Sequence, residues 1–397
     1  MIDQVTGFKA AAVRAGLKKQ LDKTDMGVIF SDTPATAAAV FTTSRVKAAP
    51  VQLSMSRIVS GQCRAVLINA GNANACTGPE GLRDAEELTA LLADRLHLET
   101  GLVLAASTGV IGARLNKEAM TAAIPKLVES LHPAGLTEVA EAMMTTDTVK
   151  KTVFKEMNLG GVPVRMFGMV KGAGMIRPDM ATMLCFVVTD AAVEAGFLNQ
   201  VLREAVDASF HRITVDGDTS TNDTVLVMAN GRCAGPVIDG TSGSVGLQFG
   251  RMLQETLVEL AEMVVKDGEG ATKLVRIILQ GARDAAQAKA AAMTVAESSL
   301  VKTAIFGRDA NWGRIMAALG RSGAEFDPEM TDIIFDQVKL VSQGRWAGAE
   351  AERAATQVLQ QPELTITIDI KAGPAAFTAL TCDLSIDYIK INADYRS

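Results

Sequence analysis

The chain is organised around one glycine-rich loop and the strand after it, which read Val170-Lys171-Gly172-Ala173-Gly174-Met175-Ile176-Arg177-Pro178-Asp179-Met180-Ala181-Thr182-Met183-Leu184. The apolar run Leu184-Cys185-Phe186-Val187-Val188 beyond the loop predicts a buried strand. A lysine and glycines beside a threonine hydroxyl, at the edge of a strand, suit a chemical site. The physical pattern alone leaves the chemistry open.

Helical and strand-like segments are mixed along the chain, which predicts an α/β protein. Short apolar runs that end at turn-forming residues read as strands, and apolar residues with helical spacing read as helices. The predicted strands are 27–30, 37–41, 64–69, 102–106, 162–169, 184–188, 225–228, 274–279, 301–306, 333–340, 364–370 and 377–384. The predicted helices are 82–96, 117–131, 136–144, 194–210, 247–265 and 284–296.

Length and composition fit a large globular enzyme. The 397 residues, 48% of them hydrophobic and 21% charged, suffice for two or three domains. The net charge of -6 argues against nucleic acid as the main partner, because phosphate binding favours a basic surface. No window is apolar enough for a membrane span, and the N-terminus lacks a signal-peptide core. Five scattered cysteines indicate reduced thiols, so we expect a cytoplasmic protein.

Several common catalytic designs do not fit the motifs. The lysine of the central loop precedes its glycines, unlike a P-loop, and Gly172-Ala173-Gly174 lacks the third glycine of a dinucleotide fingerprint. The three histidines fall in or beside predicted helices, so a histidine triad is poorly supported. The polar run 216–224 lacks the spacing of a calcium loop, and we interpret it as a hydrogen-bonded turn. No metal is expected.

Three further loops carry candidate polar groups. Ser107-Thr108-Gly109 ends a predicted strand, where small residues let a ligand approach the backbone. A hydroxyl-rich cluster extends from Thr145 to Thr148, and it would also serve as a cap or turn. Glu269 lies between two glycines, which favour a tight turn. A structural role remains an alternative for each loop taken alone.

Together these motifs resemble the ornithine acetyltransferase family, also called glutamate N-acetyltransferase. The likeness extends from Thr6-Gly7-Phe8 to the terminal Asn392-Ala393-Asp394-Tyr395-Arg396-Ser397. The resemblance implies an α/β fold, a layered αββα-like sandwich of the self-cleaving, N-terminal-nucleophile type. It also implies a cut between Ala181 and Thr182. The products would be an N-terminal chain, 1–181, and a C-terminal chain, 182–397, in a heterotetramer with two copies of each.

Thr182 matches the position of the nucleophilic threonine in this family. A threonine hydroxyl is too weak an acid to ionise near neutral pH, so it needs a base. Cleavage would free the α-amine of Thr182, and such amines have pKa values of about 7.7–8.0. One residue would then carry both nucleophile and base, which suits a chain with three histidines.

The resemblance implies that the acetyl group of N2-acetylornithine passes through acetyl-Thr182 to glutamate, giving ornithine and N-acetylglutamate in the cyclic arginine pathway. It leaves open whether acetyl-CoA is a second donor, and it implies no cofactor. One alternative is an N-terminal nucleophile hydrolase, such as an aminopeptidase of related architecture. A small-molecule binder without catalytic activity is another.

The matching family positions also suggest the site residues. Thr108 and Gly109 inherit the oxyanion hole. Lys171 is expected to bind a carboxylate or to lower the pKa of the Thr182 amine, and Glu269 suits the ornithine ammonium. Thr145 is favoured as the substrate-binding hydroxyl, with Thr148 as the alternative. The other predicted substrate contacts are Thr182, Asn392 and Ser397.

Overall fold

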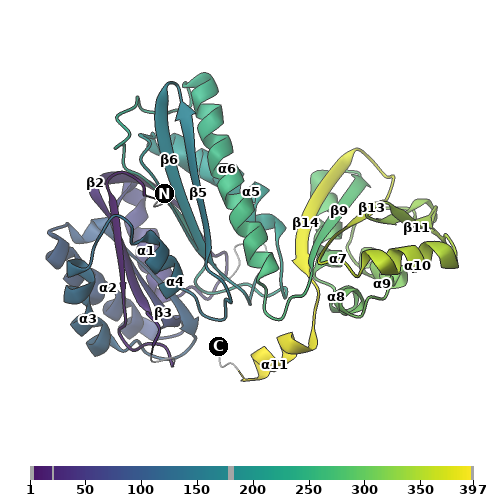
Figure 1. Ribbon diagram of the computed structural model, residues 1–397, viewed down its shortest axis with the longest axis horizontal. Helices are drawn as coiled ribbons and strands as arrows, with labels where there is room; N and C mark the ends of the chain where they lie inside the picture. The colour runs from purple at the N-terminus through teal and green to yellow at the C-terminus, as the bar shows by residue number, and fades with distance from the viewer. Residues whose placement is uncertain (1–3, 20–21, 178–182, 395–397) are drawn as a thin grey trace.

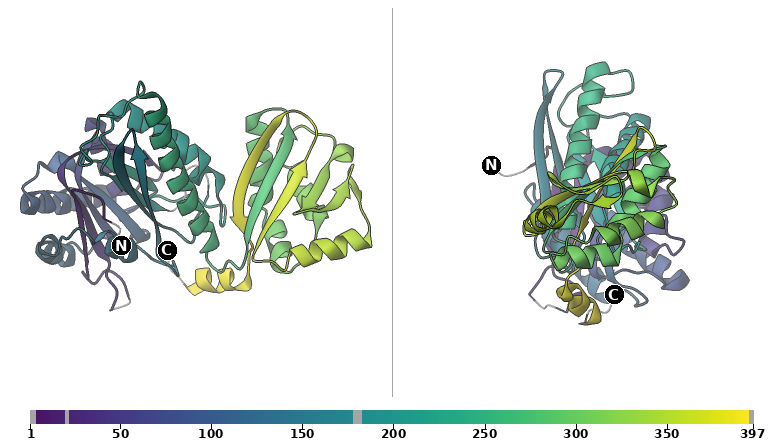
Figure 2. Two further views of the ribbon diagram at one scale, coloured as in Figure 1. Left: turned by 45° about the horizontal axis from the view of Figure 1, so that its top comes forward. Right: turned by 90° about the vertical axis from the view of Figure 1, so that its right-hand side faces the viewer.

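The computed structural model describes residues 4–19, 22–177 and 183–394. The predicted nucleophile Thr182 and the terminal Ser397 therefore lie outside the described residues. Within these ranges, an eight-stranded sheet forms the larger body of the molecule and a six-stranded sheet forms the smaller one. The two bodies lie side by side, and the C-terminal helix extends from the smaller body towards the larger one (Figure 1, Figure 2).

The large sheet changes direction within its longest strand, β2 (Met26–Phe41). The first part of β2 pairs with β1 and β3, whereas the part from Thr36 onward pairs with β8. The register shifts between Phe30 and Ala35, at the boundary of the two parts. Its strand order is β4-β3-β2-β8-β7-β6-β5, with β1 beside β2. The other strands are β1 (Phe8–Val13), β3 (Gln62–Asn72), β4 (Val103–Val110), β5 (Lys151–Leu159), β6 (Val162–Lys171), β7 (Leu184–Thr189) and β8 (Thr224–Ala229).

The two halves of this sheet pack face to face. Ile29 and Ile68 of the first half share one buried cluster with Phe186 of the second half. The outer face of the first half packs on α2 and α3, and the outer face of the second packs on α5 and α6. This order of layers confirms the predicted αββα sandwich. The helices of this body are α1 (Ala49–Arg57), α2 (Gly78–Leu96), α3 (Lys117–Glu129), α4 (Leu136–Ala142), α5 (Ala195–Ala208) and α6 (Gly243–Lys266).

The smaller body has its own apolar core. Its sheet, of order β12-β11-β10-β13-β9-β14, contributes Ile277, Ile333 and Ile366, and these side chains pack against four helices. Helix α11 (Ile386–Asp394) follows the last strand of this body. The strands are β9 (Leu274–Ala282), β10 (Asp332–Phe335), β11 (Val338–Ser342), β12 (Arg345–Trp346), β13 (Glu363–Asp369) and β14 (Ala375–Cys382), and the helices are α7 (Ala285–Ala296), α8 (Ser299–Phe306), α9 (Trp312–Gly320) and α10 (Ala349–Val358).

Four predicted segments differ from the structure. Residues 301–306, predicted as a strand, belong to helix α8, because Val301, Ala304 and Ile305 recur with helical spacing on its buried face. The predicted strand 333–340 is a hairpin of β10 and β11, which turns at Asp336 with φ +49°. The predicted strands 27–30 and 37–41 are two parts of the continuous β2.

The proposed division at Ala181–Thr182 stays a prediction. Strand β7, which begins two residues after that bond, lies between β6 and β8. Chains 1–181 and 182–397 would therefore share a single sheet.

Candidate active site

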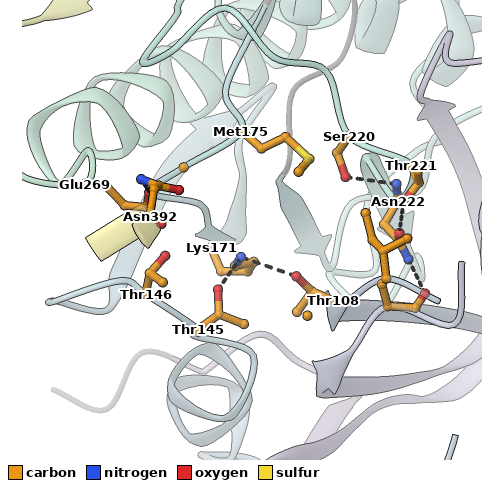
Figure 3. A pocket seen from close by; sticks show the side chains of 14 residues that line it. Thr108, Thr145, Thr146, Lys171, Met175, Ser220, Thr221, Asn222, Glu269 and Asn392 are labelled. Atoms are coloured by element: carbon orange, nitrogen blue, oxygen red, sulfur yellow. Dashed lines mark hydrogen bonds between the residues drawn. The ribbon is translucent and has the colours of Figure 1, made fainter. Parts of the chain in front are cut away.

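Six of the predicted site residues line one pocket at an end of the larger body. Figure 3 shows side chains from distant parts of the sequence around this pocket. Thr108 and Gly109 come from the end of β4, and Lys171 is the last residue of β6. Thr145 precedes β5, Glu269 follows α6 and Asn392 lies in α11. The predicted residues that line the pocket are Thr108, Gly109, Thr145, Lys171, Glu269 and Asn392.

Lys171 links two of the predicted hydroxyls. Its Nζ donates to Thr145 Oγ1 at 2.8 Å and to Thr108 Oγ1 at 3.3 Å (Figure 3). The side chain is only 3% exposed, and this burial lowers the pKa of the Lys171 ammonium, while Asp147 opposes the shift. Lys171 therefore brings a poorly hydrated cation close to the predicted oxyanion turn.

A chain of buried charges lies behind Lys171. Asp147 Oδ2 is 4.0 Å from Lys171 Nζ, and Asp147 Oδ1 is 2.7 Å from the Nζ of Lys151. Burial alone would raise the pKa of Asp147, but Lys171 and Lys151 hold it below its ordinary value. Lys151 also pairs with Asp267 Oδ2 at 2.5 Å. Each charge of this network has an opposite partner, as buried ions require.

The turn at Thr108 and Gly109 depends on glycine. Gly109 has φ +132°, and a Cβ at this position would lie 2.3 Å from the carbonyl carbon of Gly71. Asn222 holds the neighbouring backbone, because its Nδ2 donates to the carbonyls of Ser107 at 2.9 Å and Ala73 at 2.7 Å. Two loops from separate strands are thus fixed beside the pocket.

Close packing positions Glu269. A Cβ on Gly174 would lie 2.4 Å from the carboxyl carbon of Glu269, so a larger residue there would displace the Glu269 carboxylate. The Glu269 N–H donates to the Ala173 carbonyl at 2.8 Å, and Asn392 Nδ2 donates to Glu269 Oε2 at 2.8 Å. Glu269 has an exposed fraction of 8%. It presents a carboxylate on the pocket wall, a suitable partner for a substrate cation.

The C-terminal helix is tied to the central loop and to the Glu269 turn. Asp216 accepts hydrogen bonds from the N–H groups of Met175 at 2.6 Å and Ile176 at 2.9 Å, and from the Tyr388 hydroxyl at 3.3 Å. Ser385 Oγ donates to the Gly270 carbonyl at 2.6 Å. These bonds bring Asn392 to the pocket. Within the polar run 216–224, the Asp218 N–H donates to Asp216 Oδ1 at 3.2 Å and the Asn222 N–H donates to Ser220 Oγ at 3.1 Å, which confirms the predicted hydrogen-bonded turn.

One predicted residue lies apart from the others. Thr148, the alternative to Thr145, is exposed and points to Asp267, which accepts from its N–H at 3.1 Å and from its hydroxyl. It does not line the pocket that the six residues share. Sequence reasoning missed the roles of Asp147 and Asn222, although both lie in polar runs that it had singled out.

Other classes of site find little support in the described ranges. The three histidines lie outside the pocket: His97 ends α2, while His132 and His211 contact Glu138 and Asp207. No cluster of three or more metal-ligating His, Cys, Asp or Glu side chains occurs among the described residues. In the same part of the chain, every helix is too short or too polar to cross a bilayer.

Sequence comparisons with known proteins match almost the entire chain, and a solved structure matches about half of it. A model of the ArgJ family matches residues 9–397. The arginine biosynthesis bifunctional protein ArgJ of Geobacter sulfurreducens is 52% identical over 394 residues, which are 99% of this chain and 100% of that protein. The ArgJ protein of Desulfotalea psychrophila is 50% identical over 395 residues, again 99% of this chain and 100% of the relative. A crystal structure of the bifunctional protein argJ from Bacillus halodurans is similar, with a TM-score of 0.50 and 39% identity; the match covers 53% of this chain and 98% of that one.

Proposed function

The chain belongs to the ArgJ family, and from this membership we propose that it carries acetyl groups from N2-acetylornithine to glutamate through Thr182. It is an acyltransferase of arginine biosynthesis. The observation that carries the proposal is the pocket in which Thr108, Lys171 and Glu269 meet. Family membership favours acetyl transfer over hydrolysis, the alternative that the motifs left open.

The proposed cycle has two halves. The Thr182 hydroxyl attacks the acetyl carbonyl of N2-acetylornithine, and its own α-amine, freed by cleavage after Ala181, takes the proton. Ornithine leaves with that proton, and the acetyl group stays on Thr182. The amine of glutamate then attacks the acetyl ester, so N-acetylglutamate forms and the hydroxyl is restored. No metal or redox cofactor takes part in either half.

The pocket residues have matching roles in this cycle. Thr108 and Gly109 stabilise the oxyanion, for which a single donor typically contributes about 3–4 kcal/mol. Lys171 lies within hydrogen-bonding distance of Thr108, which supports a position near the developing negative charge. Glu269, held by Asn392, binds the side-chain ammonium of ornithine. Thr145 binds substrate in preference to Thr148, and Ser397 adds a polar contact.

The wider setting is also part of the proposal. Chains 1–181 and 182–397 form a heterotetramer with two copies of each. The five cysteines have no disulfide partner in the described chain, which supports a cytoplasmic location. Acetyl-CoA, if it reacts, enters as a substrate in place of N2-acetylornithine.

One assay tests the proposal. Purified enzyme is incubated with glutamate and either N2-acetylornithine or acetyl-CoA, and N-acetylglutamate is measured while intact mass follows the two chains. We expect product from N2-acetylornithine, a cut after Ala181 and an acetyl adduct on Thr182. The variant Thr182→Ala should give neither cleavage nor transfer. Release of free acetate without N-acetylglutamate would instead identify a hydrolase.

A further inference from the structure

Lys171 is a buried cation that needs a negative charge nearby. Its side chain is 3% exposed, and its Nζ donates to two neutral hydroxyls, those of Thr145 and Thr108. Removing an ammonium group from water is costly, and neutral acceptors recover only part of the lost hydration. Among the described residues, only Asp147 places a carboxylate oxygen within 4.0 Å of this Nζ.

The carboxylate of Asp147 also holds the backbone on both sides of this contact. Its Oδ1 accepts from the Gly172 N–H at 2.7 Å, directly after Lys171, and its Oδ2 accepts from the Thr145 N–H at 3.0 Å. Lys171 ends β6, whereas Thr145 lies in the segment before β5. Asp147 therefore ties together the two segments whose side chains meet in the 2.8 Å hydrogen bond from Lys171 to Thr145.

Asp147 influences the pocket without lining it. Its side chain has 0% exposed surface, and it is absent from the residues that surround the pocket. Both carboxylate oxygens are bonded within the protein, because Oδ1 also accepts from Lys151 Nζ at 2.7 Å. A carboxylate occupied in this way does not contact a substrate, so its effect on the reaction must pass through its neighbours.

The distance between Asp147 and Lys171 leaves the ammonium group able to bind a ligand. At 4.0 Å, Asp147 Oδ2 attracts Lys171 Nζ but is too far away for a hydrogen bond. Two of the three donors of Lys171 are bonded to Thr145 and Thr108, and no other acceptor in the described ranges takes the third. Asp147 thus balances the charge of Lys171 while leaving a donor free.

The charge of Lys171 depends mainly on Asp147. Burial lowers the pKa of the Lys171 ammonium, and Asp147 is the strongest influence in the opposite direction. Without that carboxylate, the ammonium would lose its proton at a lower pH than in the wild type. The charged groups that face Lys171 from the neighbouring elements are Asp147, Lys151, Glu269, Asp223 and Lys18.

We propose that Asp147 is a positioning residue of this site, which orients Lys171 towards Thr108 and Thr145 and supplies the negative charge that balances its ammonium. The inference rests on the proposed function in one respect, that Lys171 assists acetyl transfer as a cation. Asp147 neither gives nor takes a proton in the cycle, and it forms no bond to substrate. In its absence, the oxyanion turn would face a neutral amine that is no longer held in place.

A titration of Lys171 tests the charge directly. Lysine is labelled isotopically at Cε in the whole enzyme and followed by NMR, and the Lys171 signal is identified by its absence from Lys171→Met. Asp147→Asn keeps the shape of the side chain but removes its charge, so the Lys171 signal should titrate at lower pH than in the wild type. Asp190→Asn is the matched control and should leave this titration unchanged. Asp190 is also buried, and it accepts the N–H of Arg165, towards the start of β6, at 2.8 Å.

Acetyl transfer tests the positioning. We compare kcat/KM of fully cleaved Asp147→Asn, Lys171→Met and the double variant. If Asp147 acts through Lys171, its substitution should lower kcat/KM about tenfold when Lys171 is present and at most about twofold in Lys171→Met. A merely structural role would give the same loss in both backgrounds. Asp190→Asn should stay within about twofold of the wild type per folded molecule.

Either an unchanged Lys171 titration in Asp147→Asn or equal losses in the two backgrounds would overturn the inference. If Asp147→Asn does not fold, the same substitution is made in Lys151→Met, so that one charge of each sign is removed. That double variant is then compared with Lys151→Met by the same titration. A wild-type enzyme that forms no N-acetylglutamate would overturn the proposed function, and the titration would still decide the inference about Asp147.

Discussion

Two networks of lysine and aspartate side chains, one in each body of the molecule, differ in their exposure to water. The αββα body contains a connected chain of buried charges beside its pocket, from Lys171 through Asp147 and Lys151 to Asp267. In the smaller body, Asp332 faces lysines that remain partly in water: the side chain of Lys339 is 48% exposed and that of Lys371 31%. Both bodies have full apolar cores, so stability alone does not account for the difference.

Burying a charged side chain lowers the stability of a protein unless the charge is paired, so a network of buried charges calls for a reason other than stability. Removing an ion from water is unfavourable by several kcal/mol even after the protein relaxes, and apolar side chains of the same volume are often equally stable. Strongly perturbed ionisable groups therefore concentrate at functional sites. The smaller body supports the pocket mainly by carrying α11, whose Asn392 reaches Glu269.

The largest effect is expected from Lys151→Met. Lys151 is 1% exposed, and its loss leaves Asp267 without its lysine partner and Asp147 with Lys171 alone, at 4.0 Å. We expect the free energy of unfolding to fall by about 3–5 kcal/mol, as when one partner of a buried pair is removed. Urea titration at neutral pH measures this change.

The matched variant in the smaller body is Lys339→Met. Lys339 is half-exposed, and Lys371 stays 3.0 Å from Asp332 after the substitution. The expected loss is therefore no more than about 1 kcal/mol. Equal losses in the two variants would show that the bodies do not differ in this respect.

A smaller effect, on activity, is expected from Lys171→Met. Without its ammonium, Thr108 and Thr145 lose a shared donor and the developing oxyanion loses a nearby cation. We expect kcat/KM for acetyl transfer to fall about 100-fold, the usual effect of losing one such group. The measurement uses fully cleaved enzyme, so that slow maturation does not contribute.

Lys302→Met provides the comparison for that measurement. Lys302 is an equally buried lysine of the smaller body, and it donates to Thr381 at 2.8 Å, away from the pocket. Its loss should reduce stability while kcat/KM per folded molecule stays unchanged. Similar drops in kcat/KM for both lysines would mean that the Lys171 effect arises from general destabilisation.

The sequence predicted the αββα body better than the smaller one. Strands β3, β4, β6 and β7 have continuous apolar runs bounded by turn residues, and these patterns give the element type directly. In α8, Val301 and Ile305 are β-branched, so residue preference suggested a strand where the spacing of buried positions is helical. Strand β5 was missed because polar residues alternate along it and only part of it is buried.

Family likeness predicted six of the residues that line the pocket, but it did not predict the charge network behind them. Nothing in the spacing of Asp147, Lys151 and Asp267 indicates that they touch, since Asp267 lies far along the chain. Asp223 belongs to a polar run that suggested a turn, and only the strand register reveals its contact with Met183. Local patterns specify elements, whereas contacts between distant side chains depend on how the layers meet.

The smallest effect on activity is expected from substitutions of Thr145 and Thr148, which lie three residues apart in the sequence. Thr145 Oγ1 accepts a hydrogen bond from Lys171 inside the pocket, whereas the Thr148 hydroxyl donates to Asp267 at an exposed position. Valine replaces threonine with almost the same shape, so each substitution removes little more than the hydroxyl. We expect Thr145→Val to lower kcat/KM for acetyl transfer about tenfold, equivalent to one hydrogen bond of about 1.4 kcal/mol. Thr148→Val should stay within about twofold of the wild type, since its hydroxyl bond lies near the surface.

Steady-state rates with N2-acetylornithine and glutamate measure the effects of both substitutions. A larger loss of kcat/KM in Thr148→Val than in Thr145→Val would contradict this assignment. It would instead place the bound substrate near Asp267, at the exposed end of the charge network.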